Sequence, residues 1–262
     1  MATGGDLVVT ARLEELAGRL LRAIRERTSI APLTSEHPNL SLEEAYRIQD
    51  LVVEALGGRT AAKLGLTSKA KQQQMQVASP LFAWLPPGSL LGPDQPLVVA
   101  ELIQPRLEPE IAFVLGRDLT GPTTIAHVLA ATERVVPALE VLDSRFEGYT
   151  FTLADVVADD GSAARYVVGG PGTPVQGIDL RLAGCVFEKN GRVVATAAGA
   201  AVLDHPAAAV AWFAGELASR GEKLEAGTTV LAGALTAAVA VEPGDVVRAT
   251  FDRMGTVEVT CR

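Results

Sequence analysis

The sequence predicts an α+β protein, in which a small helical N-terminal region, residues 1–60, precedes a large and mostly β region, residues 61–262. Two observations predict this division. Before residue 60, apolar residues recur with the 3.6-residue period of an amphipathic helix. After it, short apolar runs alternate with Gly-rich turns, a pattern typical of strands.

Two helices are predicted in the N-terminal region. Residues 11–26 carry leucines at helical spacing, so one face of this segment is expected to be buried. Ser41 and Glu44 form a capping box, the motif in which the first and fourth residues of a helix start satisfy each other's backbone amides. The second helix is expected to end at Gly57.

The region after residue 60 is predicted to contain two helices, near 124–133 and 206–220, among many strands. Pro206 is suited to the first turn of the second of these helices. Asn190-Gly191 between two apolar runs predicts a tight β-hairpin. The predicted strands are 111–115, 135–142, 165–168, 180–187, 192–197, 229–232, 237–241, 246–251 and 256–260.

Composition excludes several classes of protein. With 48% hydrophobic and 21% charged residues, the 262-residue chain has the composition of a globular protein with a sizeable core. A net charge of −8 offers no basic surface for nucleic acid or acidic membranes. No apolar run is long enough for a bilayer, and the first residues do not resemble a signal peptide. Two cysteines are too few for a disulfide framework, so we expect a cytoplasmic protein.

Three glutamates are the strongest candidates for a functional site. Glu108 and Glu110 stand two residues apart on a predicted strand, so they point to the same face. Glu140 lies in a second apolar run, where an unpaired buried charge is costly. Three converging carboxylates form a hard-oxygen site for Mg²⁺ or Mn²⁺. The alternative interpretation is a pair of solvated acids at a strand end, because Pro109 favours a strand start or edge.

Five segments together resemble one family, the 2-keto-4-pentenoate hydratase / 4-oxalocrotonate decarboxylase family of the fumarylacetoacetate hydrolase superfamily. The resemblance extends in order from about residue 10 to the C-terminus. It implies a mixed β-roll or barrel-like catalytic domain, an Mg²⁺-type cofactor, homo-oligomers and a role in the breakdown of aromatic compounds. The segments are KLGLTSK (63–69), EPE (108–110), PALEVLDSR (137–145), DVVADDGS (155–162) and LAGALT (231–236).

The resemblance assigns roles to individual residues. It places the metal ligands at Glu108, Glu110 and Glu140, in agreement with the strand pattern, and the active-site lysine at Lys63, which spacing alone would leave as a surface lysine. It also implies that the substrate, a 2-oxo acid, is bound by Ser162, Thr67 and Leu81. The family's usual Asp-Asn-Ala-Ser reads Asp-Asp-Gly-Ser at 159–162, a departure that affects the local loop geometry.

Two reactions are compatible with this family. Its hydratase members carry acids where this chain has Ala78 and Leu81, and they tend to have a Gly-Pro pair near Ala237. Hydration requires a general acid or base to activate water, whereas decarboxylation does not. The absence of these acids favours decarboxylation of 2-oxo-3-hexenedioate over hydration of 2-hydroxypenta-2,4-dienoate. A divergent hydratase is the alternative.

A third hypothesis belongs to another class of protein. Members of the two branches associate with each other, so an alternative hypothesis is that the chain is a non-catalytic partner of a hydratase subunit. The intact set of carboxylates and Lys63 argues against that role. Asp143 and Arg145, just after Glu140, are expected either to hold that glutamate or to form an ordinary salt bridge.

Overall fold

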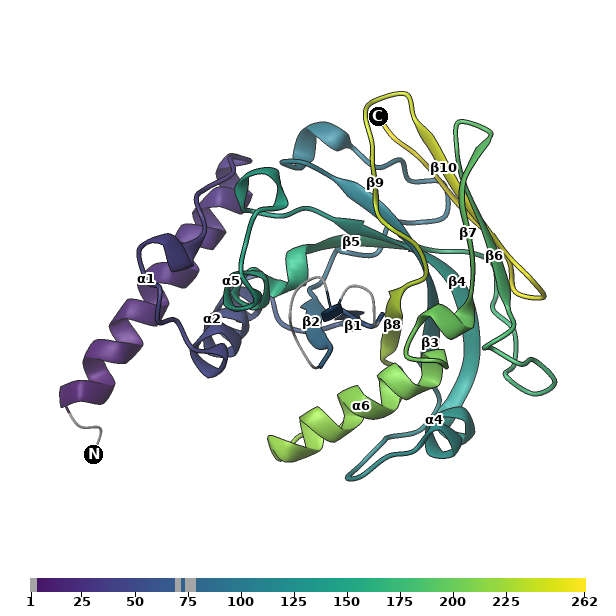
Figure 1. The fold of residues 1–262 in the computed structure, drawn as a ribbon, viewed down its shortest axis with the longest axis horizontal. Helices are drawn as coiled ribbons and strands as arrows, with labels where there is room; N and C mark the ends of the chain where they lie inside the picture. The colour runs from purple at the N-terminus through teal and green to yellow at the C-terminus, as the bar shows by residue number, and fades with distance from the viewer. Residues whose placement is uncertain (1–3, 69–71, 74–78) are drawn as a thin grey trace.

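The structure, a computed structural model, describes residues 4–68, 72–73 and 79–262 and confirms the predicted α+β class (Figure 1). Its larger sheet has the strand order β2-β1-β8-β3-β4-β5, with β9 added beside β3. These strands are β1 (Ala61–Gly65), β2 (Leu81–Leu85), β3 (Arg106–Leu115), β4 (Thr132–Leu142), β5 (Ala163–Val168), β8 (Thr229–Ala234) and β9 (Val239–Ala240). Every pairing is antiparallel except that of β1 with β8.

A second sheet has four antiparallel strands in the order β11-β10-β6-β7. They are β6 (Gly184–Lys189), β7 (Arg192–Ala198), β10 (Val246–Phe251) and β11 (Gly255–Thr260). Strands β10 and β11 pack against β4, so the two sheets share one large core. That core includes the fully buried rings of Phe113, Phe187 and Phe213.

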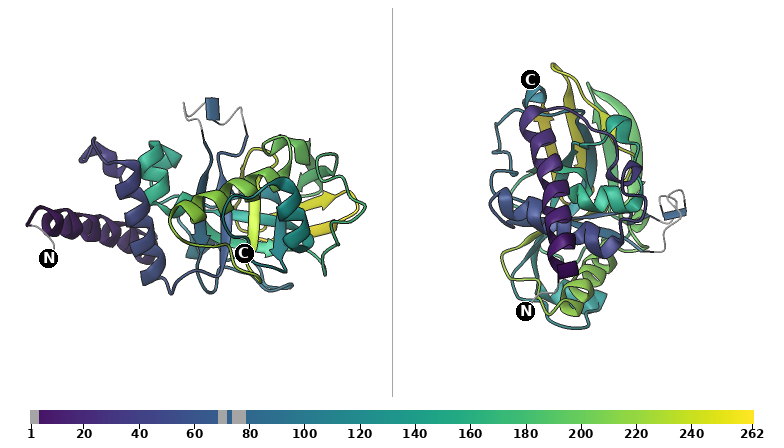
Figure 2. Two further views of the ribbon diagram at one scale, coloured as in Figure 1. Left: turned by 90° about the horizontal axis from the view of Figure 1, so that it is seen from below. Right: turned by 90° about the vertical axis from the view of Figure 1, so that its left-hand side faces the viewer.

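Five helices lie around the sheets in the described part of the chain. They are α1 (Gly4–Glu26), α2 (Leu42–Ala55), α4 (Ile125–Ala131), α5 (Leu153–Ala158) and α6 (Pro206–Ser219). Short 3₁₀ turns occur at Leu33–Ser35, Val99–Glu101, Glu147–Tyr149, Asp160–Ser162 and Gly199–Ala201. Helix α6 packs on β8 and β1, whereas α1, α2 and α5 gather at the opposite end from the four-stranded sheet (Figure 2). No helix in the described ranges is long and apolar enough to span a bilayer.

The helices at this end have a hydrophobic core of their own. Leu16 of α1 and Ile48 of α2 pack in one buried cluster with Phe146 and with residues of α5. The predicted capping box is confirmed, since the Ser41 hydroxyl accepts from the Glu44 amide at 3.2 Å and the Glu44 carboxylate accepts from the Ser41 amide at 3.0 Å. Because α5 follows β4 in sequence, this cluster joins both predicted regions, and the boundary near residue 60 stays a prediction.

Several predicted elements have different bounds. Helix α1 begins before residue 11, and strands β1 and β2 and helix α5 were not predicted. The strand predicted over 180–187 begins only at Gly184, because the amides of Leu182 and Ala183 turn back to the Asp179 carbonyl. The strand predicted over 237–241 is limited to β9. The Asn190-Gly191 hairpin is confirmed, joining β6 to β7.

Pro109 does not mark a strand start or edge, and that prediction was wrong. It lies inside β3, which is paired on both sides. On one side Pro109 stands opposite Leu139 of β4; on the other the register with β8 shifts after Glu110. The Pro109 carbonyl accepts from the Leu235 amide at 3.0 Å, just after β8 ends. This irregularity lets a residue without an N–H lie within a central strand.

Candidate active site

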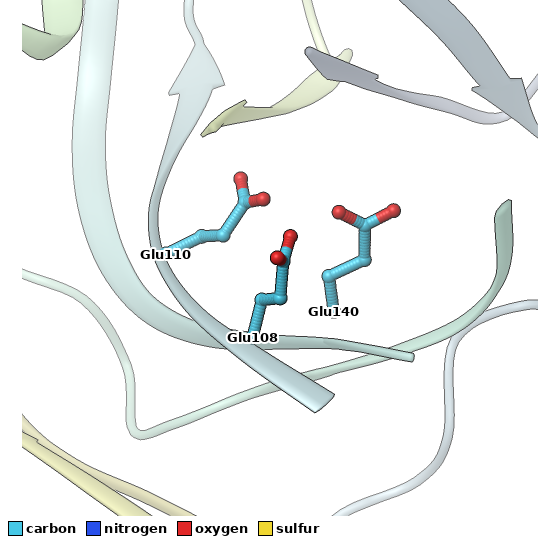
Figure 3. A group of neighbouring side chains, drawn as sticks. All are labelled: Glu108, Glu110 and Glu140. Carbon is cyan, nitrogen blue, oxygen red and sulfur yellow. The ribbon is translucent and has the colours of Figure 1, made fainter. Parts of the chain in front are cut away.

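The three predicted carboxylates converge. Glu108 on β3 is directly opposite Glu140 on β4, and Glu110 follows Glu108 on the same face of the strand. One oxygen from each of the three side chains lies within 4.8 Å of the others. Figure 3 shows all three carboxyl groups directed into one space. Their side chains are buried, with relative exposures of 6%, 0% and 0%, so the interpretation as solvated acids was wrong.

The site carries more negative charge than its neighbours neutralise. Burial, and then the proximity of Glu140, raise the pKa of Glu110 well above its usual value. Burial likewise raises the pKa of Glu140. Glu110 Oε2 accepts from the Gly233 amide at 2.7 Å. By contrast, Glu110 Oε1 and Glu140 Oε2 have no hydrogen-bond partner in the described ranges.

The oxygens of Glu110 and Glu140 that lack a partner bear on whether the residues present can bind a divalent metal. Buried polar atoms without partners are rare, because each loses its hydration. A hard cation such as Mg²⁺ prefers carboxylate oxygen and would satisfy the open atoms of Glu110 and Glu140. It would also offset the mutual repulsion of the three acids. The donor set therefore fits a metal of this class.

Lys63 lies beside the carboxylates. Strand β1 places it between Ala83 of β2 and Leu231 of β8, in the interior of the sheet. Its Nζ is 3.0 Å from Glu140 Oε1, and its side chain is only 5% exposed. Burial by itself would lower the pKa of Lys63, but the attraction of the neighbouring glutamates, Glu140 above all, raises it. Lys63 is therefore a buried ammonium group and not a surface lysine.

Gly233 fixes the backbone next to the carboxylates. Its φ is +115°, and a side-chain Cβ at this position would stand 2.0 Å from Thr67 Oγ1. Only glycine allows the chain to approach Thr67 this closely and to donate its amide to Glu110. Thr67 is itself buried, and its carbonyl accepts from the Leu203 amide. Its predicted role in substrate binding stays a prediction.

The loop that carries Ser162 is held by a buried ion pair. Residues Asp160, Gly161 and Ser162 have φ values of +50°, +60° and +59°, so the chain makes a short left-handed turn. Ser162 Oγ donates to Asp159 Oδ2 at 3.2 Å. Arg145 forms a salt bridge with Asp159, and it also donates to the Asp143 carbonyl at 2.7 Å.

Gly161 is needed at the centre of this turn. A Cβ here would stand 3.0 Å from Ala83 Cβ and 3.3 Å from both Leu81 Cδ1 and Lys63 Cε. The Ser162 loop therefore lies close against Lys63 and Leu81 at this glycine. Asp160, beside Gly161, accepts from the Trp84 amide at 2.9 Å, and burial raises its pKa to about 8.

Asp143 and Arg145 form structural contacts. Asp143 accepts from the amides of Ile103 at 2.9 Å and Gln104 at 2.7 Å, while Arg145 pairs with Asp159. The second alternative in the sequence analysis, an ordinary salt bridge, is thus correct for Arg145. Asp143 instead anchors the segment that leads into β3.

The site opens into a cavity of about 350 Å³. Two of the predicted substrate-binding residues, Ser162 and Leu81, line it, together with Lys63 and Glu108. Ala78, at which the sequence distinguished the two reactions, lies outside the described residues. The other lining residues are Gly65, Leu66, Arg106, Leu142, Tyr149, Phe151, Val156, Gly161, Ala237 and Ala238.

Two polar lining residues, Arg106 and Tyr149, were not predicted from the sequence. For Arg106 a signal existed, since it precedes Glu108 by two residues and therefore shares its face of the strand. Tyr149 lies in an irregular segment after β4, and nothing in its sequence neighbourhood indicated that it reaches the cavity.

Comparison with known proteins agrees with this geometry. The family model described as fumarylacetoacetate (FAA) hydrolase C-terminal matches residues 56–262. The chain is 42% identical to a 4-oxalocrotonate decarboxylase of Pseudomonas putida, over 92% of this chain and 94% of that protein. It is 40% identical to a 2-keto-4-pentenoate hydratase of Paraburkholderia xenovorans, over 93% of each.

A solved structure is also similar throughout. The 4-oxalocrotonate decarboxylase from Pseudomonas putida G7, complexed with magnesium and adipate, superimposes with a TM-score of 0.93. The two chains are 37% identical, and the match covers 97% of this chain and 98% of that one. The resemblance found in the sequence is confirmed, and the chain belongs to the fumarylacetoacetate hydrolase family.

Proposed function

We propose that the protein is a metal-dependent lyase that decarboxylates 2-oxo-3-hexenedioate to 2-hydroxypenta-2,4-dienoate and CO₂. One observation carries the proposal. Glu108 of the carboxylate cluster and Lys63 both line the cavity, and among its described lining residues no acid other than Glu108 is present. Such a site can bind and polarise a 2-oxo acid, but it offers no separate carboxylate for activating water.

Decarboxylation suits this distribution of groups. The bond between C5 and the C6 carboxylate breaks, and its electron pair moves through the conjugated chain to the oxygen on C2. Glu108, Glu110 and Glu140 would hold Mg²⁺ or Mn²⁺, which would supply Lewis-acid stabilisation of that negative charge. The ammonium group of Lys63, next to Glu140, adds positive charge and a proton source on the same side of the cavity.

The remaining walls position the substrate. Ser162 lines the cavity, and the family resemblance implies that it binds the C1 carboxylate; Leu81 lies beside its loop. Apolar side chains of Leu142, Phe151 and Val156 cover the carbon chain. Such surroundings keep water away from the carbon chain.

The second candidate function is hydration of 2-hydroxypenta-2,4-dienoate to 4-hydroxy-2-oxopentanoate. It is supported by the 40% identity to a protein named 2-keto-4-pentenoate hydratase. Apart from Lys63, Tyr149 is the described lining residue nearest in chemistry to a general acid, but its hydroxyl donates to the Gln104 carbonyl at 3.2 Å. Hydration would therefore have to use Lys63 or a group from outside the described lining.

Several further properties belong to the same proposal. The relative complexed with adipate supports a small dicarboxylic acid as the ligand of this cavity. A homo-oligomer, a complex with a hydratase of the same family, and a cytoplasmic location are proposed because the family resemblance and the composition favour them.

The test is an assay of the purified chain with 2-oxo-3-hexenedioate, with and without Mg²⁺. We expect Mg²⁺-dependent CO₂ release together with the absorbance of the dienoate product. Consumption of 2-hydroxypenta-2,4-dienoate without CO₂ release from the diacid would instead favour the hydratase. Inertness toward both compounds would support a non-catalytic partner subunit and contradict the proposal.

A further inference from the structure

Arg106 is a half-buried cation that lines the cavity, and none of the roles assigned above uses it. It starts β3, and in the register with β4 it pairs with Leu142, one same-face step beyond the pair of Glu108 and Glu140. Two residues along a strand are separated by about 6.7 Å, a length comparable to that of an extended six-carbon chain. A molecule held at the carboxylate cluster by one end therefore reaches Arg106 with the other.

The guanidinium group of Arg106 is held in place but not neutralised. Its Cζ lies 3.9 Å from the centre of the Tyr149 ring, in a cation–π contact. Tyr149 is itself fixed by its hydrogen bond to the Gln104 carbonyl. No carboxylate of the described residues forms an ion pair with Arg106, although such pairs are common on this protein's surface. A positioned guanidinium with free donors is suited to bind a carboxylate.

We propose that Arg106, positioned by Tyr149, binds the second carboxylate of the substrate and so selects dicarboxylic over monocarboxylic 2-oxo acids. This inference rests on the proposed function, because the second carboxylate is taken to be the group that leaves as CO₂. Loss of CO₂ removes the anion that Arg106 holds. The product, a monocarboxylate, is then bound at one end only, which favours its release.

The experiment compares two ligands that differ only at the far end. Both 2-oxohexanedioate and 2-oxohexanoate carry the same 2-oxo acid head, but only the first has a second carboxylate. Their dissociation constants are measured by calorimetry with the full chain in the presence of Mg²⁺. We expect the wild type to prefer the diacid by roughly tenfold or more, as is typical of a charge-assisted pair.

Substitutions of Arg106 should remove this preference selectively. Arg106→Met is expected to bind the two acids within about twofold of each other while its affinity for 2-oxohexanoate stays near that of the wild type. Arg106→Lys should keep part of the preference, since it retains the charge but not the planar fork. Arg248→Met, which removes an exposed arginine on β10, is the matched control and should behave as the wild type.

Three results would overturn the inference. They are an unchanged diacid preference in Arg106→Met, an equal loss of affinity for both acids, and a wild type that does not discriminate between them. If Arg106→Met does not fold by circular dichroism, Arg106→Gln carries the same expectation. This experiment measures binding, so it is independent of turnover. If the proposed function fails, the wild type still prefers the diacid but releases no CO₂ from 2-oxo-3-hexenedioate.

Discussion

Two buried clusters of charge lie close together in this protein, and they are built in opposite ways. In the cluster of Arg145 and Asp159 the guanidinium and the carboxylate form a salt bridge, and backbone and hydroxyl groups satisfy the remaining atoms. In the cluster of Glu108, Glu110 and Glu140, oxygens of Glu110 and Glu140 have no hydrogen-bond partner in the described residues, although these side chains are equally buried.

This difference separates a scaffold from a binding site. A closed ion pair holds its own elements together and leaves nothing for a ligand. Buried carboxylates without partners destabilise the metal-free protein, so their presence indicates that a cation binds them. Ser162 connects the two clusters, because its hydroxyl donates to Asp159 and the residue also lines the cavity beside Lys63 and Glu108.

The largest expected effect comes from removing one open carboxylate. Glu110→Gln should lower metal-dependent turnover at least about 1,000-fold, or about 4 kcal/mol in the barrier, because a ligand is lost. The metal-free variant should unfold at a higher temperature than the metal-free wild type, since burial and repulsion disfavour the Glu110 charge. Turnover and thermal unfolding measure the two effects.

The matched control for this prediction is Glu133→Gln, which neutralises an exposed acid on β4. It should leave both turnover and the unfolding temperature close to those of the wild type. Normal turnover in Glu110→Gln would show that the open cluster is not a ligand set.

The second effect concerns the closed cluster. Arg145→Met leaves Asp159 buried without its partner, which should destabilise the protein by about 3–5 kcal/mol. Denaturant unfolding measures this loss in metal-free protein. The two clusters should therefore respond with opposite signs, stabilisation at Glu110 and destabilisation at Arg145. A stability change of the same sign at both positions would contradict it.

The third effect is a pH dependence that originates between the clusters, at Asp160. Burial raises the pKa of Asp160 to about 8, against about 3.8 in the unfolded chain. Between these values the folded protein holds a proton that the unfolded chain releases, so this group makes the protein less stable as pH rises. Asp160→Asn keeps the acceptor for the Trp84 amide but cannot ionise.

The stability of Asp160→Asn relative to the wild type should therefore grow by about 2–3 kcal/mol from pH 5 to pH 7. Denaturant unfolding at several pH values between 4 and 9 follows this difference. Parallel stability curves for the two proteins would rule out a proton on Asp160 in the folded state.

The smallest effect is expected at Gly161. Gly161→Ala introduces a Cβ where φ is +60° and where Ala83 stands at 3.0 Å, so it should cost about 1–2 kcal/mol. It should also weaken binding of a 2-oxo acid, because the Ser162 loop moves away from Lys63. Calorimetry with 2-oxohexanoate and denaturant unfolding test both statements. An unchanged affinity would show that this turn does not position Ser162.

The carboxylate cluster was predictable from sequence for a local reason. A strand places alternate residues on one face, so Glu108 and Glu110 had to point together, and the apolar run around Glu140 implied burial. Pairing of β3 with β4 then brought Glu140 opposite Glu108. Family resemblance, and not periodicity, identified Lys63, because β1 is a five-residue strand in which an interior lysine gives no strand signal.

Contacts set by the tertiary fold were not predictable in this way. The approach of Tyr149 to Arg106 depends on a loop after β4, and the packing of α5 on α2 brings residues about a hundred positions apart together. The position of Pro109 followed from the local shift in register between β3 and β8, which no propensity describes. Sequence patterns thus specified the face of each strand, while the partners across the cavity came from the fold.

Anomalous diffraction from crystals of the wild type grown with Mn²⁺ locates the metal itself. We expect a single strong anomalous peak among Glu108, Glu110 and Glu140, with an oxygen of each at about 2.0–2.2 Å, the range of hard divalent ions of this size. No peak at this position, or a peak coordinated by other residues, would contradict this expectation.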